Sequence, residues 1–559
     1  MPIINIESNE LIDIDTPFKV SAGPGAGKTY WLTQHIHNVV KRSDKLFISK
    51  KVLCITYTNN AVKTICSRLD NANSRVEVTT IHSFLYNHIV KPYVSVIAND
   101  FNLDISKIDG HDDTILTNYT FMQELFKRAD VYVASQDISK VIDALKRAYW
   151  HFDSSNELVI KPNYPIKIGK YSLKNTTYTE YKKMAWEKGV LHHDDVLFFT
   201  YQILKKAPFV AEIISEKFPY IFIDEFQDCT PIQIFAFNEF AKFATVGVIG
   251  DYAQSIYGFQ GANPDTFEEF SLARIRKYQI TSNRRSSKEI INLLNEIRSD
   301  LQQTSIKELS ELKPMILVGD VFQAYEYTRQ HTENIMTLSR NNITSNLMKS
   351  GLNTSNFNDK LLVNLSAFDS NPIRSKLIST SITAVFLLNN SNFKDAIKTL
   401  QTNYSKNDLE LEKKVLRYLT KLSESFETFK NLSLLDFSIF INDLADFSFP
   451  KVTRGKVKTF YEDHRFFDLY MCANSVNDNS QHITIHKSKG SEFDSVLLLM
   501  RELKELDVLI ASDLNKEEQR ISYVALSRAK NKLFINVPTM QESIRAKLLS
   551  IDSIEVVNL

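Results

Sequence analysis

A glycine-rich segment near the N-terminus has the composition of a phosphate-binding loop. It reads Ala22-Gly23-Pro24-Gly25-Ala26-Gly27-Lys28-Thr29 and lies between an apolar strand-like run and a predicted helix. Glycines let the backbone wrap a triphosphate, and the helix N-terminus presents free N–H groups and a positive dipole to it. We expect Lys28 to reach the β- and γ-phosphates and the Thr29 hydroxyl to bind Mg²⁺. The alternative is a glycine-rich turn without a ligand, since Ala22 replaces the first glycine of the simplest pattern.

Two adjacent carboxylates end a second apolar run, Tyr220–Ile223. Asp224, at the tip of this strand, can hold Mg²⁺ directly or through water, and Glu225 can polarise an attacking water. An Asp-Glu pair after a strand is, on its own, more often a solvated turn. Together with a phosphate-binding loop on the same sheet, the pair predicts hydrolysis of ATP.

The strands that must position these groups fall into two blocks. The first contains Phe18–Val20, Lys51–Tyr57, Tyr220–Ile223 and Thr245–Ile249, and the second contains Tyr278–Ile280, Met315–Val318, Ile335–Leu338, Ile483–Ile485, Val496–Leu499 and Lys532–Val537. β-branched runs that alternate with helical patterns predict parallel sheets with crossover helices. We therefore predict the α/β class, with two parallel-sheet cores.

A long, mainly helical insertion interrupts each predicted core. The insertions include helical patterns at Leu145–Trp150 and Asp408–Leu422. The predicted domains are a first core at 1–88 and 189–271 with its insertion at 89–188, and a second core at 272–345 and 476–559 with its insertion at 346–475.

The composition is that of an ordinary globular protein, with 43% hydrophobic and 24% charged residues in 559. The sequence contains no apolar run of about 18 residues, which argues against a membrane span or a signal peptide. Its four scattered cysteines favour reduced thiols in the cytoplasm. The net charge of +1 leaves a nucleic-acid role open, because such binding needs local basic patches rather than a high total charge.

A set of ordered motifs resembles those of superfamily 1 DNA helicases of the UvrD/Rep type. The acidic motif is Asp224–Asp228, and the others are Thr56–Ala61, Thr80–Phe84, Gly250–Ala262, Asn283–Ser286, Ile335–Arg340, Thr484–Phe493 and Tyr523–Ala529. The resemblance spans both cores and implies that they are RecA-like motor cores, with ATP in the cleft between them.

The resemblance also implies roles around ATP. Gln227 and Gln254 match residues that sense the γ-phosphate, and Arg285 and Arg528 match two arginines that complete the pocket from the second core. Planar, delocalised arginines suit the charge of the transition state better than lysine does. Two further positions match the nucleoside side of the pocket, Glu492 near the sugar and Arg284 near the base.

A DNA track needs aromatic platforms for bases and hydroxyl or basic groups for phosphates. The resemblance implies that the following residues face DNA: Thr58, Asn59, His82, Phe84, Tyr257, Phe259, Thr484 and His486. For Phe84 and Tyr257, packing at the seam between domains is the alternative, because aromatic side chains are usually buried.

Some residues depart from the family pattern. Arg284 stands where a tyrosine commonly stacks on adenine, and no glutamine precedes Gln34 to read the base. These changes leave strict selectivity for ATP open. Phe259 replaces the usual tryptophan and keeps a stacking surface. Gln260 replaces an arginine and removes a charge, so the strength of coupling between the ATP and DNA sites is expected to differ.

Two clusters have competing interpretations. The run His192-His193-Asp194-Asp195 could bind a metal, but adjacent side chains splay apart, so we expect Asp194 or Asp195 to cap the following helix. Lys146 and Arg147, with Tyr149 and Trp150, could grip DNA or could form an amphipathic surface helix.

The sequence therefore predicts an ATP-dependent DNA helicase or translocase that moves 3′ to 5′ on single-stranded DNA, with ATP and Mg²⁺. The direction is implied only by the resemblance. The alternative is a DNA-sensing ATPase that gates a separate nuclease, because the sequence shows no nuclease constellation. Short chains of this kind resemble helicase subunits of bacterial anti-phage systems such as Gabija.

Overall fold

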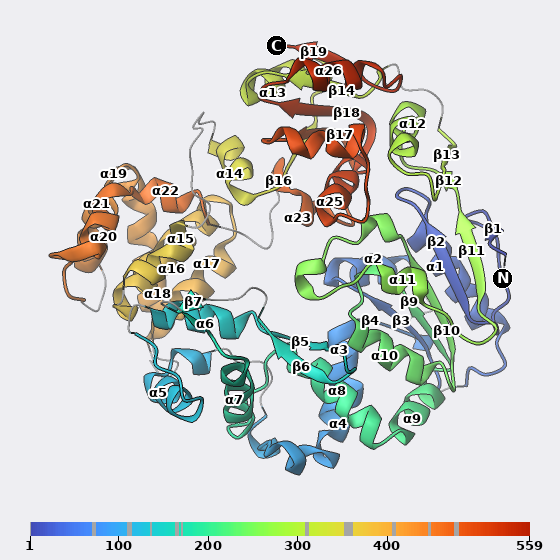
Figure 1. Cartoon of the computed structure of the whole chain (residues 1–559), viewed down its shortest axis with the longest axis horizontal. Coiled ribbons are helices and arrows are strands. Elements are labelled where there is room, and N and C mark those ends of the chain that lie inside the picture. The colour runs from blue at the N-terminus through green and yellow to red at the C-terminus, as the bar shows by residue number, and fades with distance from the viewer. Residues whose placement is uncertain are drawn as a thin grey trace.

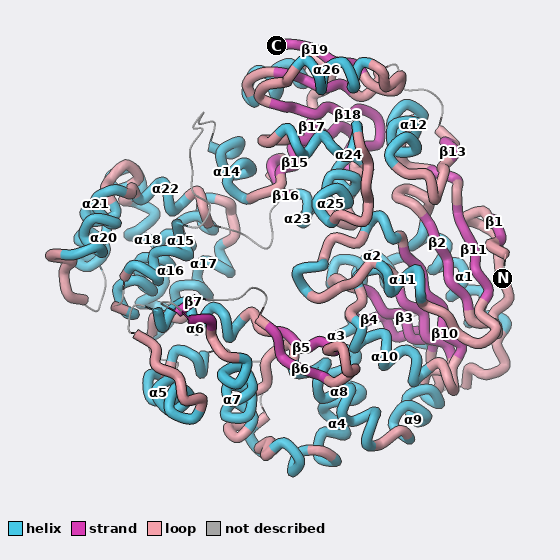
Figure 2. Tube along the Cα trace, viewed as in Figure 1, coloured by secondary structure: helices cyan, strands magenta, loops and turns pink. Residues whose placement is uncertain are grey.

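The computed structural model describes residues 2–47, 49–69, 74–108, 114–134, 137–162, 167–168, 171–307, 312–350, 361–369, 371–404, 410–444, 449–473 and 480–559. Figure 1 shows two separate α/β units, one that carries the N-terminus and one that carries the C-terminus. The helices of the second insertion gather in a unit of their own, without strands among the described residues (Figure 2).

The first sheet has seven parallel strands. Their order is β1 (Ile4–Asn5), β11 (Arg276–Ile280), β2 (Phe18–Ala22), β10 (Thr245–Gly250), β9 (Tyr220–Ile223), β3 (Val52–Thr56) and β4 (Val76–Thr80). The central strands read as continuous apolar runs because helices cover both faces of the sheet.

The two faces of this sheet have separate hydrophobic cores. Val52 and Cys54 of β3 belong to the core formed with α1 (Lys28–Arg42) and α2 (Asn59–Leu69). Leu53 and Ile55 of the same strand belong to the core formed with α3 (Ile81–Leu85), α8 (Asp195–Lys206), α9 (Phe209–Lys217) and α10 (Pro231–Phe240). Successive side chains of a strand point to opposite faces, so β3 anchors helices on both sides.

The second sheet has six parallel strands. Their order is β16 (His482–Thr484), β15 (Ile335–Ser339), β17 (Phe493–Leu499), β18 (Ala529–Val537), β14 (Met315–Val318) and β19 (Glu555–Asn558). Around it lie α12 (Lys288–Ile297), α13 (Val321–Arg329), α24 (Asp507–Ile510), α25 (Glu517–Leu526) and α26 (Glu542–Leu549). The predicted α/β class with two parallel-sheet cores is confirmed.

One predicted strand lies in the first sheet rather than in the second. Tyr278–Ile280, which we predicted in the second block, lies in β11, and Tyr278 is the parallel partner of Val20 in β2. That prediction was wrong because the apolar pattern of a strand predicts its existence and does not specify the sheet that it joins.

The first insertion contains α5 (Tyr119–Arg128), α6 (Ile138–Lys146), α7 (Asn175–Trp186) and an antiparallel hairpin of β5 (Tyr149–Phe152) and β6 (Leu158–Lys161). Tyr149 and Trp150 therefore lie on a strand, and the predicted helix through Trp150 was wrong. Helix α6 ends at Lys146, and the backbone N–H of Arg147 closes its last turn on Asp143 O.

The described part of the second insertion consists of helices. They are α15 (Leu361–Phe368), α16 (Pro372–Asn389), α17 (Phe393–Gln401), α18 (Leu411–Glu424), α19 (Phe426–Phe429), α20 (Leu434–Leu444), α21 (Gly455–Asp463) and α22 (Phe466–Tyr470). Most of the predicted helix at Asp408–Leu422 lies in α18, and Asp408 is outside the described residues. Among the described helices, none combines the length and apolar character needed to cross a bilayer.

Asp194 and Asp195, at the N-terminus of α8, hold the first insertion against the first core. The Trp150 backbone N–H donates to Asp194 Oδ2 at 2.5 Å, and the indole N–H groups of Trp150 and Trp186 donate to Asp195 at 3.0 and 3.1 Å. Neither carboxylate makes the expected side-chain cap of α8, so that expectation was wrong. No group of three or more potential metal ligands occurs in the described parts of the chain.

Candidate functional site

The phosphate-binding loop connects β2 to α1 at the carboxyl edge of the first sheet. Gly25 and Gly27 have φ angles of 76° and 82°, a left-handed conformation that favours glycine. A Cβ added to Gly25 would lie 2.5 Å from Asn283 Oδ1. Lys28 Nζ donates to Ala22 O at 3.1 Å, so the ammonium folds back over the loop. The loop thus has the glycine-dependent backbone turn and the lysine position that a phosphate cradle requires.

The acidic pair Asp224 and Glu225 lies at the same edge of the sheet, because β9 and β2 both flank β10. Burial and the neighbouring Glu225 raise the pKa of Asp224 to about 7, although Lys28 opposes the shift. Burial also raises the pKa of Glu225, but Lys28 and Lys489 outweigh it, so this pKa lies below its usual value. The buried Asp224 and the half-buried Glu225, beside one lysine, form a donor set that suits a divalent cation.

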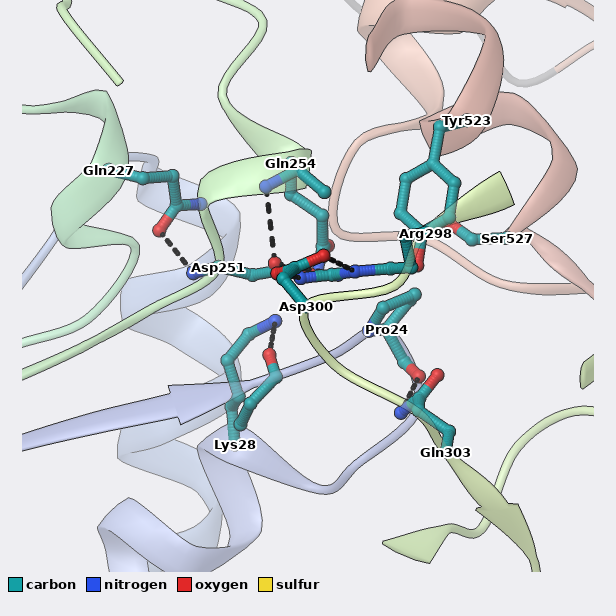
Figure 3. A network of polar contacts seen from close by, with 12 residues as sticks. Pro24, Lys28, Gln227, Asp251, Gln254, Arg298, Asp300, Gln303, Tyr523 and Ser527 are labelled. Carbon is teal, nitrogen blue, oxygen red and sulfur yellow. Dashed lines mark hydrogen bonds and ion pairs between the residues drawn. The ribbon is translucent and has the colours of Figure 1, made fainter. Parts of the chain in front are cut away.

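The predicted γ-phosphate sensors, Gln227 and Gln254, both contact Asp251 after β10 (Figure 3), and Gln227 also contacts Glu225. Gln227 Nε2 donates to Glu225 Oε2 at 2.5 Å, and Gln227 Oε1 accepts from the backbone N–H of Asp251 at 3.0 Å. Gln254 Nε2 donates to Asp251 Oδ2 at 2.6 Å. We call residues 250–262 the coupling segment. Its side chains Ala253 and Ile256 pack into the hydrophobic core of the second sheet.

The two predicted arginines of the second core lie beside this segment. Arg528 follows α25 and donates from Nη2 to Gln254 Oε1 at 3.2 Å. Burial and the neighbouring Arg285 lower the pKa of Arg528 to about 9. Arg285 donates from Nε to Glu492 Oε2 at 2.8 Å. The structure therefore brings Arg285, Arg528 and Glu492 to the loop and acidic pair of the first core.

Arg284, predicted to lie near the base, is found beside the phosphate-binding loop. Its backbone N–H donates to Gly25 O at 3.0 Å, and its Nε donates to Ser8 Oγ at 2.8 Å. Glu7 Oε2 lies 3.9 Å from Arg284 Nη2. The guanidinium is half exposed beside the phosphate-binding loop, which is compatible with the expected contact to a base.

Several residues at this site were not predicted. Lys489 of the second core pairs with Asp228, and Asn283 and Gln303 donate to Pro24 O at 2.8 and 3.1 Å. Arg298 forms an ion pair with Asp251. Lys489 and Asn283 lie inside recognised motifs, which is a signal that could have identified them. Arg298 and Gln303 follow α12 outside any motif, and their contacts depend on the fold.

The predicted DNA-facing aromatics lie where the coupling segment meets the second core. Tyr57 and Tyr257 stack with ring centroids 4.8 Å apart, and the Tyr57 hydroxyl donates to Gln260 Oε1. Phe259 is 47% exposed, and its ring centroid lies 5.9 Å from that of Tyr257 and 5.7 Å from that of His486. This group provides exposed ring surface next to polar groups, as base stacking requires.

The remaining predicted DNA contacts differ in exposure. Thr58 and Asn59 are exposed. Thr484 and His486 line a cavity of about 360 Å³ with Arg340 and Asn341, and burial and Arg340 lower the pKa of His486 to about 4.

Two early-motif residues differ in exposure: His82 is half-buried, and Phe84 is fully buried in the first core. His82 stacks on His193 at 3.8 Å, and burial and His193 lower its pKa to about 3. Phe84 is 0% exposed and packs against Phe218 and Phe240. Phe84 is therefore buried away from the expected DNA contact, and it packs inside the first core rather than at the seam between domains.

Comparisons with known proteins agree with this arrangement. The UvrD/REP helicase N-terminal domain matches residues 5–274, and the UvrD-like helicase C-terminal domain matches residues 273–539. The chain is 23% identical to Gabija protein GajB of Bacillus cereus over 86% of this chain and 84% of that protein.

It is 27% identical to ATP-dependent DNA helicase PcrA of Staphylococcus epidermidis over 59% of this chain and 44% of that protein. The match to PcrA of Staphylococcus aureus is also 27% identical and covers 56% of this chain and 41% of the relative. The chain thus aligns with less than half of the PcrA proteins. The two family models together match residues 5–539, and the chain belongs to the UvrD/Rep-type helicase family.

Proposed function

We propose that this protein is an ATP-dependent DNA helicase or translocase that uses Mg²⁺ and works in the cytoplasm. The observation that supports this best is the hydrogen bond between Arg528 of the second core and Gln254 of the first. It links an arginine suited to transition-state charge with the segment that contacts Glu225 through Gln227. Hydrolysis and the relative position of the cores would then depend on each other.

In this proposal the loop residues Gly23–Thr29 hold the phosphates, with Lys28 at the β- and γ-phosphates. Thr29 and Asp224 would hold Mg²⁺, which would supply positive charge beside the phosphates. Glu225 accepts a proton from the attacking water. Its lowered pKa favours the ionised form that a general base needs.

The second core supplies positive charge to the same reaction. Arg528 and Arg285 donate to the phosphate oxygens as charge develops in the transition state. Gln227 and Gln254 report the presence of the γ-phosphate, and Glu492 and Arg284 contact the nucleoside. Closure of the cleft on binding and its opening after hydrolysis move the two cores relative to each other.

The DNA strand would cross both cores over the surface defined by Tyr257, Phe259 and His486, and it would also meet Thr58, Asn59, His82 and Thr484. Stacking of bases on these rings gives grip that does not depend on sequence. A 3′-to-5′ direction rests on the resemblance to the UvrD/Rep branch.

The deciding experiment measures ATP hydrolysis with and without single-stranded DNA. We expect DNA to stimulate the wild type, Lys28→Ala to abolish hydrolysis, and Lys242→Ala, at an exposed surface pair, to behave as wild type. An unaffected Lys28→Ala variant would contradict the proposal. Strand displacement from substrates with opposite overhangs tests direction, and unwinding only from 5′ overhangs would overturn the 3′-to-5′ assignment.

A second function is favoured by one observation, the similarity to Gabija protein GajB along 86% of the chain. In that role the protein senses DNA within an anti-phage complex and gates a separate nuclease, with weak unwinding of its own. Copurification with a nuclease, together with DNA-stimulated hydrolysis but no strand displacement by the chain alone, would favour it.

A further inference from the structure

A buried arginine outside the recognised motifs connects the second core to the coupling segment. Arg298 directly follows α12, whose apolar side chains pack in the core of the second sheet, and it is 4% exposed. Its Nη1 donates to Asp251 Oδ1 at 2.9 Å and Oδ2 at 3.2 Å (Figure 3). Asp251, which is 2% exposed, directly follows β10 of the first core. The ion pair therefore crosses between the cores away from solvent.

The Asp251 carboxylate sets the orientation of the Gln254 side chain. An amide donates only from its nitrogen and accepts only at its oxygen. Because Gln254 Nε2 donates to Asp251 Oδ2, its Oε1 is turned toward Arg528 Nη2. A displaced Asp251 would leave Gln254 free to rotate away from Arg528.

Asp251 also reaches the acidic pair. Its backbone N–H donates to Gln227 Oε1, and Gln227 Nε2 donates to Glu225 Oε2. The position of Asp251 thus affects both the residue proposed to activate water and the residue in contact with Arg528. Arg298 is the group from the second core that holds this carboxylate.

The same arginine is tied to α25. Arg298 Nη1 lies 3.3 Å from the hydroxyl of Tyr523, and its guanidinium lies 5.5 Å from the centre of that ring. Tyr523 lies in α25, and Arg528 lies just beyond the C-terminal end of that helix. The contacts therefore close a ring that runs from α25 through Arg298, Asp251, Gln254 and Arg528 back to α25. A ring of this kind resists rotation of the coupling segment relative to α25.

We infer that Arg298 is a positioning residue for ATP hydrolysis, which holds Asp251 so that Gln227 and Gln254 keep their orientations only when the second core is docked. The inference rests on the proposed function, since it assigns a residue to that reaction. A role only in stability is the competing explanation, because an arginine that pairs with a buried carboxylate also holds two domains together.

The chain offers a matched control in the second insertion. Arg374 donates to both oxygens of the buried Asp369 at 2.7 and 2.6 Å, and the Tyr461 hydroxyl donates to the same carboxylate at 2.5 Å. This group also joins an arginine, a buried aspartate and a tyrosine, but it lies away from the phosphate-binding loop. It differs in that Tyr461 donates to the carboxylate, whereas Tyr523 accepts from Arg298, which also pairs with Asp300. Its loss should reduce thermal stability without a specific effect on hydrolysis.

The test compares Arg298→Met, Arg298→Lys and Arg374→Met by thermal unfolding and by kcat and KM for ATP with single-stranded DNA. We expect Arg298→Met to lower the DNA-stimulated kcat at least about tenfold, with KM changed less than about threefold. Arg298→Lys should recover part of kcat. Arg374→Met should lower the unfolding temperature but keep kcat within about threefold of wild type.

A double variant distinguishes a specific loss of hydrolysis from a loss of folding. Asp251→Asn with Arg298→Met removes the unpaired buried charge, so it should regain thermal stability yet remain slow. A normal kcat in Arg298→Met, or an equal loss of kcat in Arg374→Met, would overturn the inference. If DNA still stimulated hydrolysis by the wild type, the proposed function would stand. A wild type without DNA-stimulated hydrolysis would overturn the proposed function and this inference with it.

Discussion

Lys489 of the second core places its ammonium 2.5 Å from Asp228 Oδ2 and 2.8 Å from the backbone carbonyl of Gln254, both in the first core. The same ammonium lies 4.5 Å from the ring centre of Tyr257. One side chain therefore contacts the acidic motif, the coupling segment and an aromatic of the proposed DNA surface. Burial raises the pKa of Asp228 to about 6, although Lys489 opposes the shift, so the carboxylate depends on this lysine for its charge partner.

The first prediction concerns this pair. Lys489→Met leaves Asp228 buried without its cation and should reduce the free energy of unfolding by about 3 kcal/mol, measured by denaturant titration. Lys489→Met combined with Asp228→Asn should recover at least about half of the loss. Lys50→Met, at a solvent-exposed pair with Glu216, is the control and should cost less than about 1 kcal/mol. Equal losses in the two single variants would contradict the prediction.

The second prediction concerns the dependence of stability on pH. Burial raises the pKa of Asp194 from its usual 3.8 to about 7, while the Trp150 N–H and Lys182 oppose the shift and Asp195 adds to it. A folded state that binds this proton more tightly than the unfolded chain loses stability as pH rises from about 4 to about 7. Asp194→Asn keeps the acceptor for Trp150 and removes the titration.

We therefore expect Asp194→Asn to be more stable than the wild type at pH 8, by about 4 kcal/mol at most, and to match it near pH 4. Denaturant titrations across this pH range measure the difference. A difference that stays constant with pH would show that Asp194 does not titrate as described.

The sequence predicted the two parallel-sheet cores and most of the residues that gather around the phosphate-binding loop, because these depend on local patterns. The glycines before Lys28 and the carboxylates after β9 are short segments in which type and spacing carry the chemistry. Parallel strands end at the same edge of a sheet, so these segments come together once the sheet forms. Arg285 and Arg528 were predicted through the resemblance, since neither lies near the loop in sequence.

The errors come from residues whose type fits two environments. Phe84 suits a stacking surface and a hydrophobic core equally well, and only the fold shows it packed against Phe218 and Phe240. Trp150 follows an amphipathic helix, but it is paired with Ile160 in a hairpin. Arg298 has no local signal for its contact with the first core, because Asp251 lies 47 residues away in sequence.

The third prediction tests the backbone of the phosphate-binding loop. Gly25→Ala adds a Cβ that would lie 2.5 Å from Asn283 Oδ1 and 2.7 Å from Arg285 Cβ, at a φ angle of 76°. Both the clash and the strain should distort the loop, so ATP hydrolysis should fall at least about tenfold. Gly455→Ala, at φ 80° with no atom within 4 Å of the new Cβ, is the control for strain alone.

Gly455→Ala should cost about 1 kcal/mol of stability and leave ATP hydrolysis unchanged. Unfolding curves and steady-state hydrolysis of the two variants measure both effects. Full hydrolysis by Gly25→Ala would show that the loop tolerates a side chain and would weaken its assignment as a phosphate cradle.

The fourth prediction concerns Gln260 of the coupling segment, which stands where the family pattern has a positively charged arginine. Gln260 is exposed beside Tyr257 and Phe259, and it accepts a hydrogen bond from Tyr57. Gln260→Arg should add one contact to a DNA phosphate and steepen the slope of log affinity against log salt by about 0.7 for single-stranded DNA. Gln260→Met removes the same hydrogen bond without adding charge, so its slope should equal that of the wild type. Fluorescence anisotropy across salt concentrations measures the three slopes. The same slope for all three proteins would place Gln260 away from the DNA path, because an added cation in contact with phosphate must change the number of released counterions.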